Sequence, residues 1–382
     1  MGYKKKSIQL HKKHKGKIEI KSKVSVNGRD DLSMVYTPGV AGPSKEIAKD
    51  KSKAYNLTMK GNFVGIVSDG SAVLGLGNIG PEAALPVMEG KAVIFKKFVG
   101  LDAFPLCLDT QEVEEIVKTV KYLAPNFAAI NLEDISAPRC FEIEEKLQNI
   151  GIPVMHDDQH GTAVVVFAGL INALKVVEKD LSNVKVIIAG AGAAGVAILK
   201  LLKSAGMKDV LVCDSRGIIC PHRKDIPKSS YKQSVMKTTN DKGKCGPLKD
   251  ALEEADVFIG VSGPNTLKKE WIKKMNDRPI IFAMANPNPE ILPEDALIGG
   301  VYIMATGRSD YSNQINNALA YPGIFKGAIE SRAKKITPKM KLAASYAIAK
   351  LIKKPGRRNI IPSILNKKAH EAVVKAVKKA SK

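Results

Sequence analysis

Two pairs of neighbouring carboxylates, Glu133-Asp134 and Asp157-Asp158, are the residues of this sequence best suited to chemistry. Each pair follows a short apolar stretch whose pattern predicts a buried strand. Side-by-side carboxylates are poorly suited to packing, but open α/β sheets bind ligands at the carboxyl ends of their strands. Because both pairs stand at such ends, the sequence predicts a metal site at the edge of a sheet.

A dinucleotide-binding fingerprint follows further along the chain. The strand-like segment "VKVIIA" leads into a glycine-rich turn, and the helix-like segment "VAILKLLKSAG" continues from it. The residues of the turn are Gly190, Ala191, Gly192, Ala193, Ala194 and Gly195. Such glycines permit a tight turn and a close approach of pyrophosphate to the helix N-terminus. The next predicted strand ends in Asp214, whose carboxylate is placed to bind the adenosine ribose. This arrangement predicts a Rossmann-type unit that binds NAD.

Strand-like and helix-like segments alternate along the chain, which predicts an α/β fold with a parallel sheet. The predicted domains are an N-terminal α/β domain over 1–156, a Rossmann-type NAD(P)-binding domain over 157–316, and a helical segment over 317–382. We expect that last segment to pack on the first domain or on a partner subunit. A helix is expected to start near Ser44 as its N-cap, and residues 217–247 are expected to form a polar surface loop.

Positive charge dominates the composition, with a net charge of +22. Residues 4–23 hold nine lysines against one acid, and residues 331–382 hold sixteen basic residues against one acid. Because aromatic residues for base stacking are not interleaved with these charges, a solvated basic surface is favoured over nucleic-acid binding. The longest apolar run, 162–177, is interrupted by Asn172 and Lys175 and predicts a buried core helix, not a membrane span.

Two features indicate the cellular compartment. The five cysteines are scattered, and no apolar segment follows the basic N-terminus. The cysteines form no Cys-x-x-Cys pair, so we expect neither a disulfide framework nor a zinc site. Reduced thiols and the absence of a secretory signal both fit a cytoplasmic protein. The cysteines are Cys107, Cys140, Cys213, Cys220 and Cys245.

Several single residues are candidates for catalysis or binding. Tyr36 lies in a Gly/Pro-rich loop that would hold a proton donor in place, although a packing role is equally compatible. Lys91 lies in an apolar helical stretch, where snorkelling is the simpler interpretation. Asn286 and Asn317 follow predicted strands of the second sheet, and we expect them to contact substrate or nicotinamide.

Taken together, the motifs resemble the malic enzyme family in its short prokaryotic form, over roughly residues 30–330. The motifs that carry the resemblance are "VYTPGVA", "SDGSAVLGLGNIG", "PVMEGKAVIFKKF", "NLEDI", "HDDQHGTA", "GAGAAG", "ANPNPE" and "GRSDYSNQINNALAYPGIF". The resemblance implies oxidative decarboxylation of L-malate to pyruvate and CO2 with NAD or NADP and a divalent cation. Carboxylate ligands favour Mg2+ or Mn2+ for that cation.

The resemblance also implies a role for each matching residue. Tyr36 matches the general acid that protonates C3, and Lys91 matches the general base for the C2 hydroxyl. The remaining matches are the metal ligands Glu133, Asp134 and Asp158, the lysine-orienting Asp157, the cofactor residues Gly190–Gly195 and Asp214, and the substrate or nicotinamide contacts Leu74, Gly75, Asn286 and Asn317. A lysine beside a divalent cation and partly desolvated is expected to have a lowered pKa.

Three features are left open. Ala72 stands where larger members place an arginine for the substrate carboxylate, so backbone amides near Gly75–Gly77 or a lysine are expected to bind that carboxylate. Asp214 favours NAD over NADP, but Arg216, Arg223 and Lys224 would let NADP be tolerated. The short family form implies a homodimer, in which Lys91 could even serve the site of a partner.

Two alternatives compete with this interpretation. A different Rossmann dehydrogenase, such as an amino-acid dehydrogenase, would not need three metal carboxylates and would be insensitive to chelators. A nucleic-acid-binding protein would use the Lys-rich ends and would show salt-sensitive retention on DNA without turnover.

Overall fold

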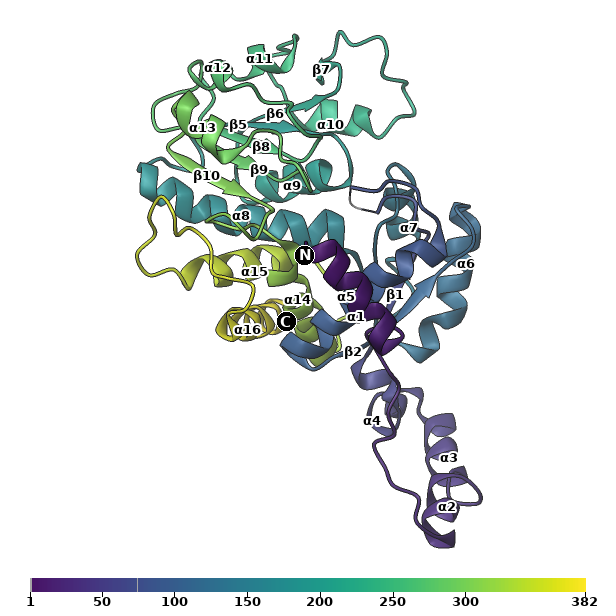
Figure 1. The fold of residues 1–382 in the computed structure, drawn as a ribbon. Helices are drawn as coiled ribbons and strands as arrows, with labels where there is room; N and C mark the ends of the chain where they lie inside the picture. The colour runs from purple at the N-terminus through teal and green to yellow at the C-terminus, as the bar shows by residue number, and fades with distance from the viewer. Residues whose placement is uncertain (1, 74) are drawn as a thin grey trace.

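The computed structural model describes residues 2–73 and 75–382, and its ribbon shows two sheets with helices around them (Figure 1). The first sheet has four parallel strands in the order β2–β1–β3–β4. These strands are β1 (Phe63–Ser68), β2 (Asp102–Cys107), β3 (Ala129–Leu132) and β4 (Val154–His156). Helices α5 (Pro81–Val99), α6 (Val113–Leu123) and α7 (Arg139–Leu147) connect them.

The second sheet has six strands in the order β10–β9–β8–β5–β6–β7, all parallel except β7 against β6. They are β5 (Lys185–Ala189), β6 (Asp209–Asp214), β7 (Gly217–Ile218), β8 (Val257–Gly260), β9 (Ile280–Ala283) and β10 (Ile303–Thr306). Helices α9 (Ala193–Ser204), α10 (Lys232–Thr238), α11 (Leu248–Ala251), α12 (Lys269–Ile272) and α13 (Pro293–Gly299) accompany them. The predicted two-domain α/β fold with a Rossmann-type unit is confirmed.

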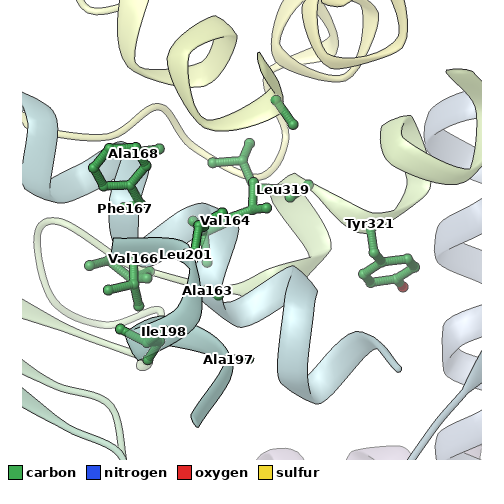
Figure 2. Packing of buried hydrophobic residues seen from close by; sticks show 14 of the residues in the cluster. Ala163, Val164, Val166, Phe167, Ala168, Ala197, Ile198, Leu201, Leu319 and Tyr321 are labelled. Atoms are coloured by element: carbon green, nitrogen blue, oxygen red, sulfur yellow. The ribbon is translucent and has the colours of Figure 1, made fainter. Parts of the chain in front are cut away.

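Helix α8 (Asp157–Val177) runs from the first sheet into the second domain. Its apolar side chains pack against α9 and against Leu319. Figure 2 shows Val164 and Val166 of α8 beside Leu201 of α9. By length and composition α8 could cross a membrane, but 72% of its most apolar 18-residue stretch is buried inside the protein. The predicted core helix over 162–177 therefore exists and begins five residues earlier, at Asp157.

Three C-terminal helices, α14 (Tyr321–Glu330), α15 (Pro338–Lys350) and α16 (Lys367–Ala380), pack back on the body. Phe95 of α5 makes edge contacts with the rings of Tyr321 and Phe325, at centroid distances of 4.9 and 5.5 Å. Helix α15 lies along α8. The C-terminal segment thus contacts the first domain within one chain, while the exact domain boundaries stay a prediction.

The N-terminal region forms an arm that extends away from both sheets (Figure 1). It carries α2 (Arg29–Val35), α3 (Ala41–Lys49) and α4 (Ala54–Leu57), and α1 (Tyr3–His14) precedes it. The predicted N-cap at Ser44 is wrong, because the Ser44 amide already donates to the Val40 carbonyl inside the helix. Short 3-10 turns complete the chain: η1 (Lys51–Lys53), η2 (Met59–Asn62), η3 (Ala124–Asn126) and η4 (Asn317–Leu319).

Residues 217–247 differ from the predicted polar loop. They contain β7 and α10, and a disulfide joins Cys220 to Cys245 across a sequence separation of 25 residues. The expectation of five reduced thiols is therefore wrong for this pair, whereas the other three cysteines are free. The spacing of these two cysteines matches no motif. They meet because the chain folds back, so that Gly246 accepts a hydrogen bond from the Ile218 amide of β7.

Candidate active site

Three carboxylates gather where β3 and β4 end. Glu133 and Asp134 follow β3, and Asp158 lies in the first turn of α8, directly after β4. Since Leu132 pairs with His156 in the register of the two strands, the acids behind them face each other. One oxygen from each of Glu133, Asp134 and Asp158 lies within 4.8 Å of the other two. The sheet edge thus collects the acids that the sequence singled out.

Mutual repulsion and burial make this cluster costly to ionise without a cation. Burial, reinforced by the neighbouring Asp158, raises the pKa of Asp134 to about 8. Burial also raises the pKa of Glu133 well above its usual range, and Lys91 opposes that shift. Asp134 Oδ2 is buried and has no hydrogen-bond partner among the described residues. A buried oxygen without a partner in a set of hard oxygen ligands fits a divalent cation such as Mg2+ or Mn2+.

Lys91 reaches this cluster from α5. Its Nζ lies 2.5 Å from Asp157 Oδ2 and 2.8 Å from Glu133 Oε1, and its side chain is only 13% exposed. Lys91 is therefore buried at the site and does not snorkel. Burial lowers the pKa of Lys91, as expected, but Asp157 and Glu133 outweigh burial and raise it well above its usual range. The lowering expected for a lysine beside a bound cation stays a prediction, because this direction describes the site without the cation.

Asp157 connects Lys91 of the first domain with Asn317 of the C-terminal segment. Its Oδ2 accepts hydrogen bonds from Lys91 and from Asn317 Nδ2, the latter at 2.9 Å. Burial raises the pKa of Asp157 to about 6, against the opposing charge of Lys91. Gly161 leaves room for this carboxylate to fold back, because a Cβ there would collide with Asp157 Oδ1. Asn317 therefore lies at the site, although the structure holds no substrate.

Tyr321, which the sequence did not single out, packs its ring against the Lys91 ammonium. The Lys91 ammonium lies 4.5 Å from the centre of the Tyr321 ring. Burial raises the pKa of Tyr321 well above its usual range, and its hydroxyl is buried without a hydrogen-bond partner among the described residues. The signal was present in the "ALAYPG" segment, where a tyrosine stands in an otherwise apolar run close to Asn317.

The glycine-rich turn has the shape that a dinucleotide requires. Gly190 has a φ of +120° and donates its amide to the Cys213 carbonyl, which ties the turn to β6. A Cβ at Gly195 would collide with the Gly190 carbonyl, so only glycine allows α9 to start this close to β5. Gly192 is the N-cap of α9, and Ala191, Ala193 and Ala194 complete the turn. The free amides of the helix N-terminus fit a pyrophosphate.

Asp214 stands at the end of β6, but its carboxylate is occupied. Arg223 binds both of its oxygens, at 3.0 and 3.1 Å, and Lys232 Nζ lies 2.6 Å from Oδ2. The Arg216 amide adds a hydrogen bond to Oδ1, while the Arg216 side chain pairs with Asp225. Although burial raises it, hydrogen bonds from Arg223 and Lys232 leave the pKa of Asp214 lowered. The predicted ribose acceptor thus also anchors two cations, of which the sequence had singled out Arg223 but not Lys232.

The two domains meet at the glycine-dense loop after β1. A Cβ on Gly75 would lie 3.2 Å from the Asn286 carbonyl oxygen and 3.0 Å from Pro287, so this glycine approaches the Asn286 loop closely. Leu74, another predicted substrate contact, lies outside the described residues. The amides of Leu76 and Gly77 donate to the Val73 carbonyl, and so two of the amides predicted for the substrate carboxylate are already used.

A guanidinium that the sequence analysis did not single out lies at the same edge. Arg139 Nη2 is 2.9 Å from Asp69 Oδ2, directly after β1, and its Nε is buried without a partner among the described residues. Arg139 follows "EDISAP" closely, and this position, just beyond the Glu133-Asp134 pair, was the available signal.

Tyr36 does not lie with the other candidates in this chain. It is the C-cap of α2, which lies on the arm that extends away from both sheets (Figure 1). Its surface is 67% exposed. Apolar neighbours on the arm, Leu32, Met34 and Val40, are exposed as well. The structure therefore brings Lys91, the acids and Asn317 together and leaves Tyr36 apart; the roles of all these residues stay predictions.

Comparisons with known proteins agree with this architecture. Residues 14–148 match the model for the malic enzyme N-terminal domain, and residues 159–381 match the model for the malic enzyme NAD-binding domain. The bifunctional malic/malolactic enzyme of Bacillus subtilis is 54% identical over 100% of this chain and 93% of its own length. The NAD-dependent malic enzyme of Geobacillus stearothermophilus is 56% identical over 96% of this chain and 77% of its own length.

A solved structure leads to the same family. The NAD-dependent malic enzyme of Thermotoga maritima superposes with a TM-score of 0.94 at 51% identity, covering 97% of this chain and 98% of that one. Its similarity extends across both sheets and the C-terminal helices, because nearly the whole chain is covered. The chain belongs to the malic enzyme family.

Proposed function

We propose that this chain catalyses the oxidative decarboxylation of L-malate to pyruvate and CO2 with reduction of NAD. The observation that carries the proposal is the contact of Lys91 with both Asp157 and Glu133 at the edge of the first sheet. This contact supports the proposal because a base for the C2 hydroxyl and ligands for a cation would then be neighbours. The reaction needs both, because hydride leaves C2 only if the hydroxyl proton is removed.

Lys91 and Tyr36 would carry the two proton transfers. Lys91 would take the proton of the C2 hydroxyl, and a bound nicotinamide would supply the acceptor for the C2 hydride, so that C2 becomes the carbonyl of a β-keto acid. Loss of CO2 then leaves an enolate, and Tyr36 protonates its C3 to give pyruvate. Asp157 orients Lys91 through their contact, and Asn317 fixes Asp157 in turn.

Glu133, Asp134 and Asp158 would hold Mg2+ or Mn2+. When bound, the cation would supply positive charge that stabilises the developing enolate. Glu133 Oε1 lies 2.8 Å from Lys91 Nζ, and Glu133 is at the same time one of the three acids whose oxygens lie within 4.8 Å of one another. Engagement of Glu133 by a cation withdraws one of the two charges that raise the pKa of Lys91, which favours its role as a base.

NAD is the proposed cofactor, with NADP tolerated. The pairing of Asp214 with Arg223 and Lys232 supports this tolerance, because a neutralised carboxylate repels a 2′-phosphate less. Lys232 remains partly exposed beside Asp214 and could approach such a phosphate.

A homodimer is proposed in which each arm completes the active site of the partner. Tyr36 is exposed on the arm, and so are its apolar neighbours Leu32, Met34 and Val40, with 41% to 67% of their surface exposed. A second copy would cover those side chains and receive Tyr36 beside its own Lys91. Nucleic acid and membrane are not proposed as partners, and the proposed compartment is the cytoplasm.

The experiment that tests the function follows reduced-nicotinamide absorbance with L-malate, Mn2+ and NAD, with parallel NADP and chelator reactions. We expect a malate-dependent rise in absorbance and stoichiometric pyruvate, both abolished by the chelator. Turnover that persists in the chelator would contradict the metal part of the proposal. No turnover with either nucleotide in folded protein would contradict the reaction itself.

A further inference from the structure

A chain of hydrogen bonds runs from the C-terminal helix α15 to the first turn of α8. Lys341 Nζ lies 3.0 Å from His160 Nδ1, and His160 Nε2 lies 2.9 Å from Glu144 Oε2. Glu144 Oε1 accepts the backbone amide of His156 at 2.9 Å. The chain of contacts therefore ends at the residue that directly precedes the two acids of α8.

The donor groups fix the direction of this series of hydrogen bonds. An ammonium group can only donate, so His160 accepts at Nδ1 and carries its proton on Nε2 toward Glu144. Both nitrogens of the ring are then used, and the ring orientation is fixed. The Glu144 side chain is 12% exposed. Although burial raises it, His160 and the His156 amide hold the pKa of Glu144 at about 2, so the carboxylate stays charged.

Lys341 reaches His160 because α15 lies parallel to α8. Ser345 Oγ donates to the Val164 carbonyl at 2.9 Å, and this pair has the same sequence separation, 181 residues, as Lys341 and His160. Further along, Asn172 Nδ2 donates to the Ala349 carbonyl. These contacts align the first turn of α15 with the first turn of α8, which carries Asp157 and Asp158.

We propose that Lys341 is a positioning residue for the carboxylate cluster, acting through His160 and Glu144. The inference rests on the proposed metal chemistry and adds to it a residue of the C-terminal segment. Three elements meet in this contact: α7 of the first domain, the connecting α8, and α15. Loss of the Lys341 ammonium frees the His160 ring and loosens the turn that aims Asp158 at Glu133 and Asp134.

The test measures Mn2+ affinity directly, by the electron paramagnetic resonance signal of free Mn2+ with the full-length protein. We expect Lys341→Met to weaken Mn2+ binding about tenfold, the lower end of the range for changes around a metal site, because Lys341 acts only through His160 and Glu144. Lys341→Arg keeps a donor and is expected to stay within about threefold of the original chain. Lys339→Met, an exposed position on the same turn of α15, is the matched control and should bind as the original chain does.

The outcomes separate a positioning role from a structural one. Equal Mn2+ affinity in Lys341→Met and the original chain would overturn the inference, even if the melting temperature fell. If Lys341→Met does not fold, Glu144→Gln takes its place and must weaken Mn2+ binding to a similar degree; an unchanged affinity would overturn the inference. An original chain that binds no Mn2+ would contradict the metal part of the proposed function, and this inference with it.

Discussion

The carboxylate centre and the N-terminal arm carry the two proposed proton-transfer groups in opposite surroundings. Lys91 is 13% exposed and paired with two acids, whereas Tyr36 is 67% exposed on the arm. Parallel strands bring residues distant in sequence to one edge, so the first group is assembled within one chain. The loop of Tyr36 belongs to no sheet, and its position depends on what the arm contacts. The motif around Tyr36 thus suggests a proton donor, but it does not indicate whether that donor serves its own chain or a partner.

Two variants that are each inactive alone test whether the arm of one chain serves the site of another. Lys91→Ala and Tyr36→Phe should each lower kcat about 10³-fold, since each removes a proton-transfer group. After the two proteins are unfolded together and refolded, half of the dimers are mixed, and each mixed dimer has one intact site. Recovery of about a quarter of the original activity is expected for arms that serve the partner.

The same mixture has a decisive contrary outcome. If Tyr36 served its own chain, each site in a mixed dimer would lack one group, and mixing would recover nothing. Refolding each variant alone is the control, and analytical ultracentrifugation of the mixture confirms that dimers formed.

A second prediction probes the charged centre alone. Asp134→Asn removes one proposed ligand, and Mn2+ affinity should fall by about a hundredfold. The same change removes repulsion from the cluster, so the metal-free variant should melt at a higher temperature than the metal-free original at pH 8.5. Melting curves with and without Mn2+ measure both the loss of stabilisation by Mn2+ and the rise in the metal-free melting temperature. A lower melting temperature for the metal-free variant would contradict the proposed repulsion.

The pH dependence of the metal-free protein follows from the raised pKa of Asp134, about 8. A carboxyl whose pKa is higher in the folded than in the unfolded state stabilises the fold while protonated, and this stabilisation is lost as the pH rises toward the folded value. Melting temperature should therefore decline between about pH 4 and pH 8 without metal. Mn2+ affinity should change in the opposite direction, by up to about tenfold per pH unit below pH 8, because the cation displaces the proton. A pH-independent affinity would contradict this.

The smallest expected effect concerns the nucleotide. Lys232→Gln should lower kcat/KM for NADP about fivefold relative to NAD, because a charge-assisted contact to the 2′-phosphate is lost. Lys228→Gln, an exposed lysine of the same segment, is the matched control. Equal losses with both nucleotides would show that Lys232 only holds Asp214.

Much of the centre was predictable because strand ends obey simple rules. The acids of Glu133-Asp134 and Asp157-Asp158 were placed at one sheet edge from their apolar flanks alone, and Gly190–Gly195 from the strand and helix around it. Lys91 was different: its apolar surroundings suggested snorkelling, and only the family resemblance indicated the site. No local pattern reports that α5 faces the edge of the sheet.

Contacts between distant elements were the part that sequence could not supply. Nothing in the local pattern joins Cys220 to Cys245 or pairs Asp214 with Lys232, because both depend on the path of residues 217–247 in space. Likewise, the position of Tyr36 depends on the direction of the arm, which a Gly/Pro-rich loop leaves undetermined. The helix start at Ala41 instead of Ser44 is a smaller error of the same kind, because backbone turns override side-chain capping preference.

The disulfide between Cys220 and Cys245 has a consequence for local opening. Cys220 is buried and Cys245 is exposed, and the segment between them carries both cations that hold Asp214. The bond restricts how far this segment can open, so amides there should exchange with solvent slowly while it is intact. A thiol reductant that reaches Cys245 should accelerate exchange in this segment and leave the strands of the second sheet protected. The segment proposed to bind the nucleotide would then respond to the thiol balance of its surroundings, while the proposed metal site would not.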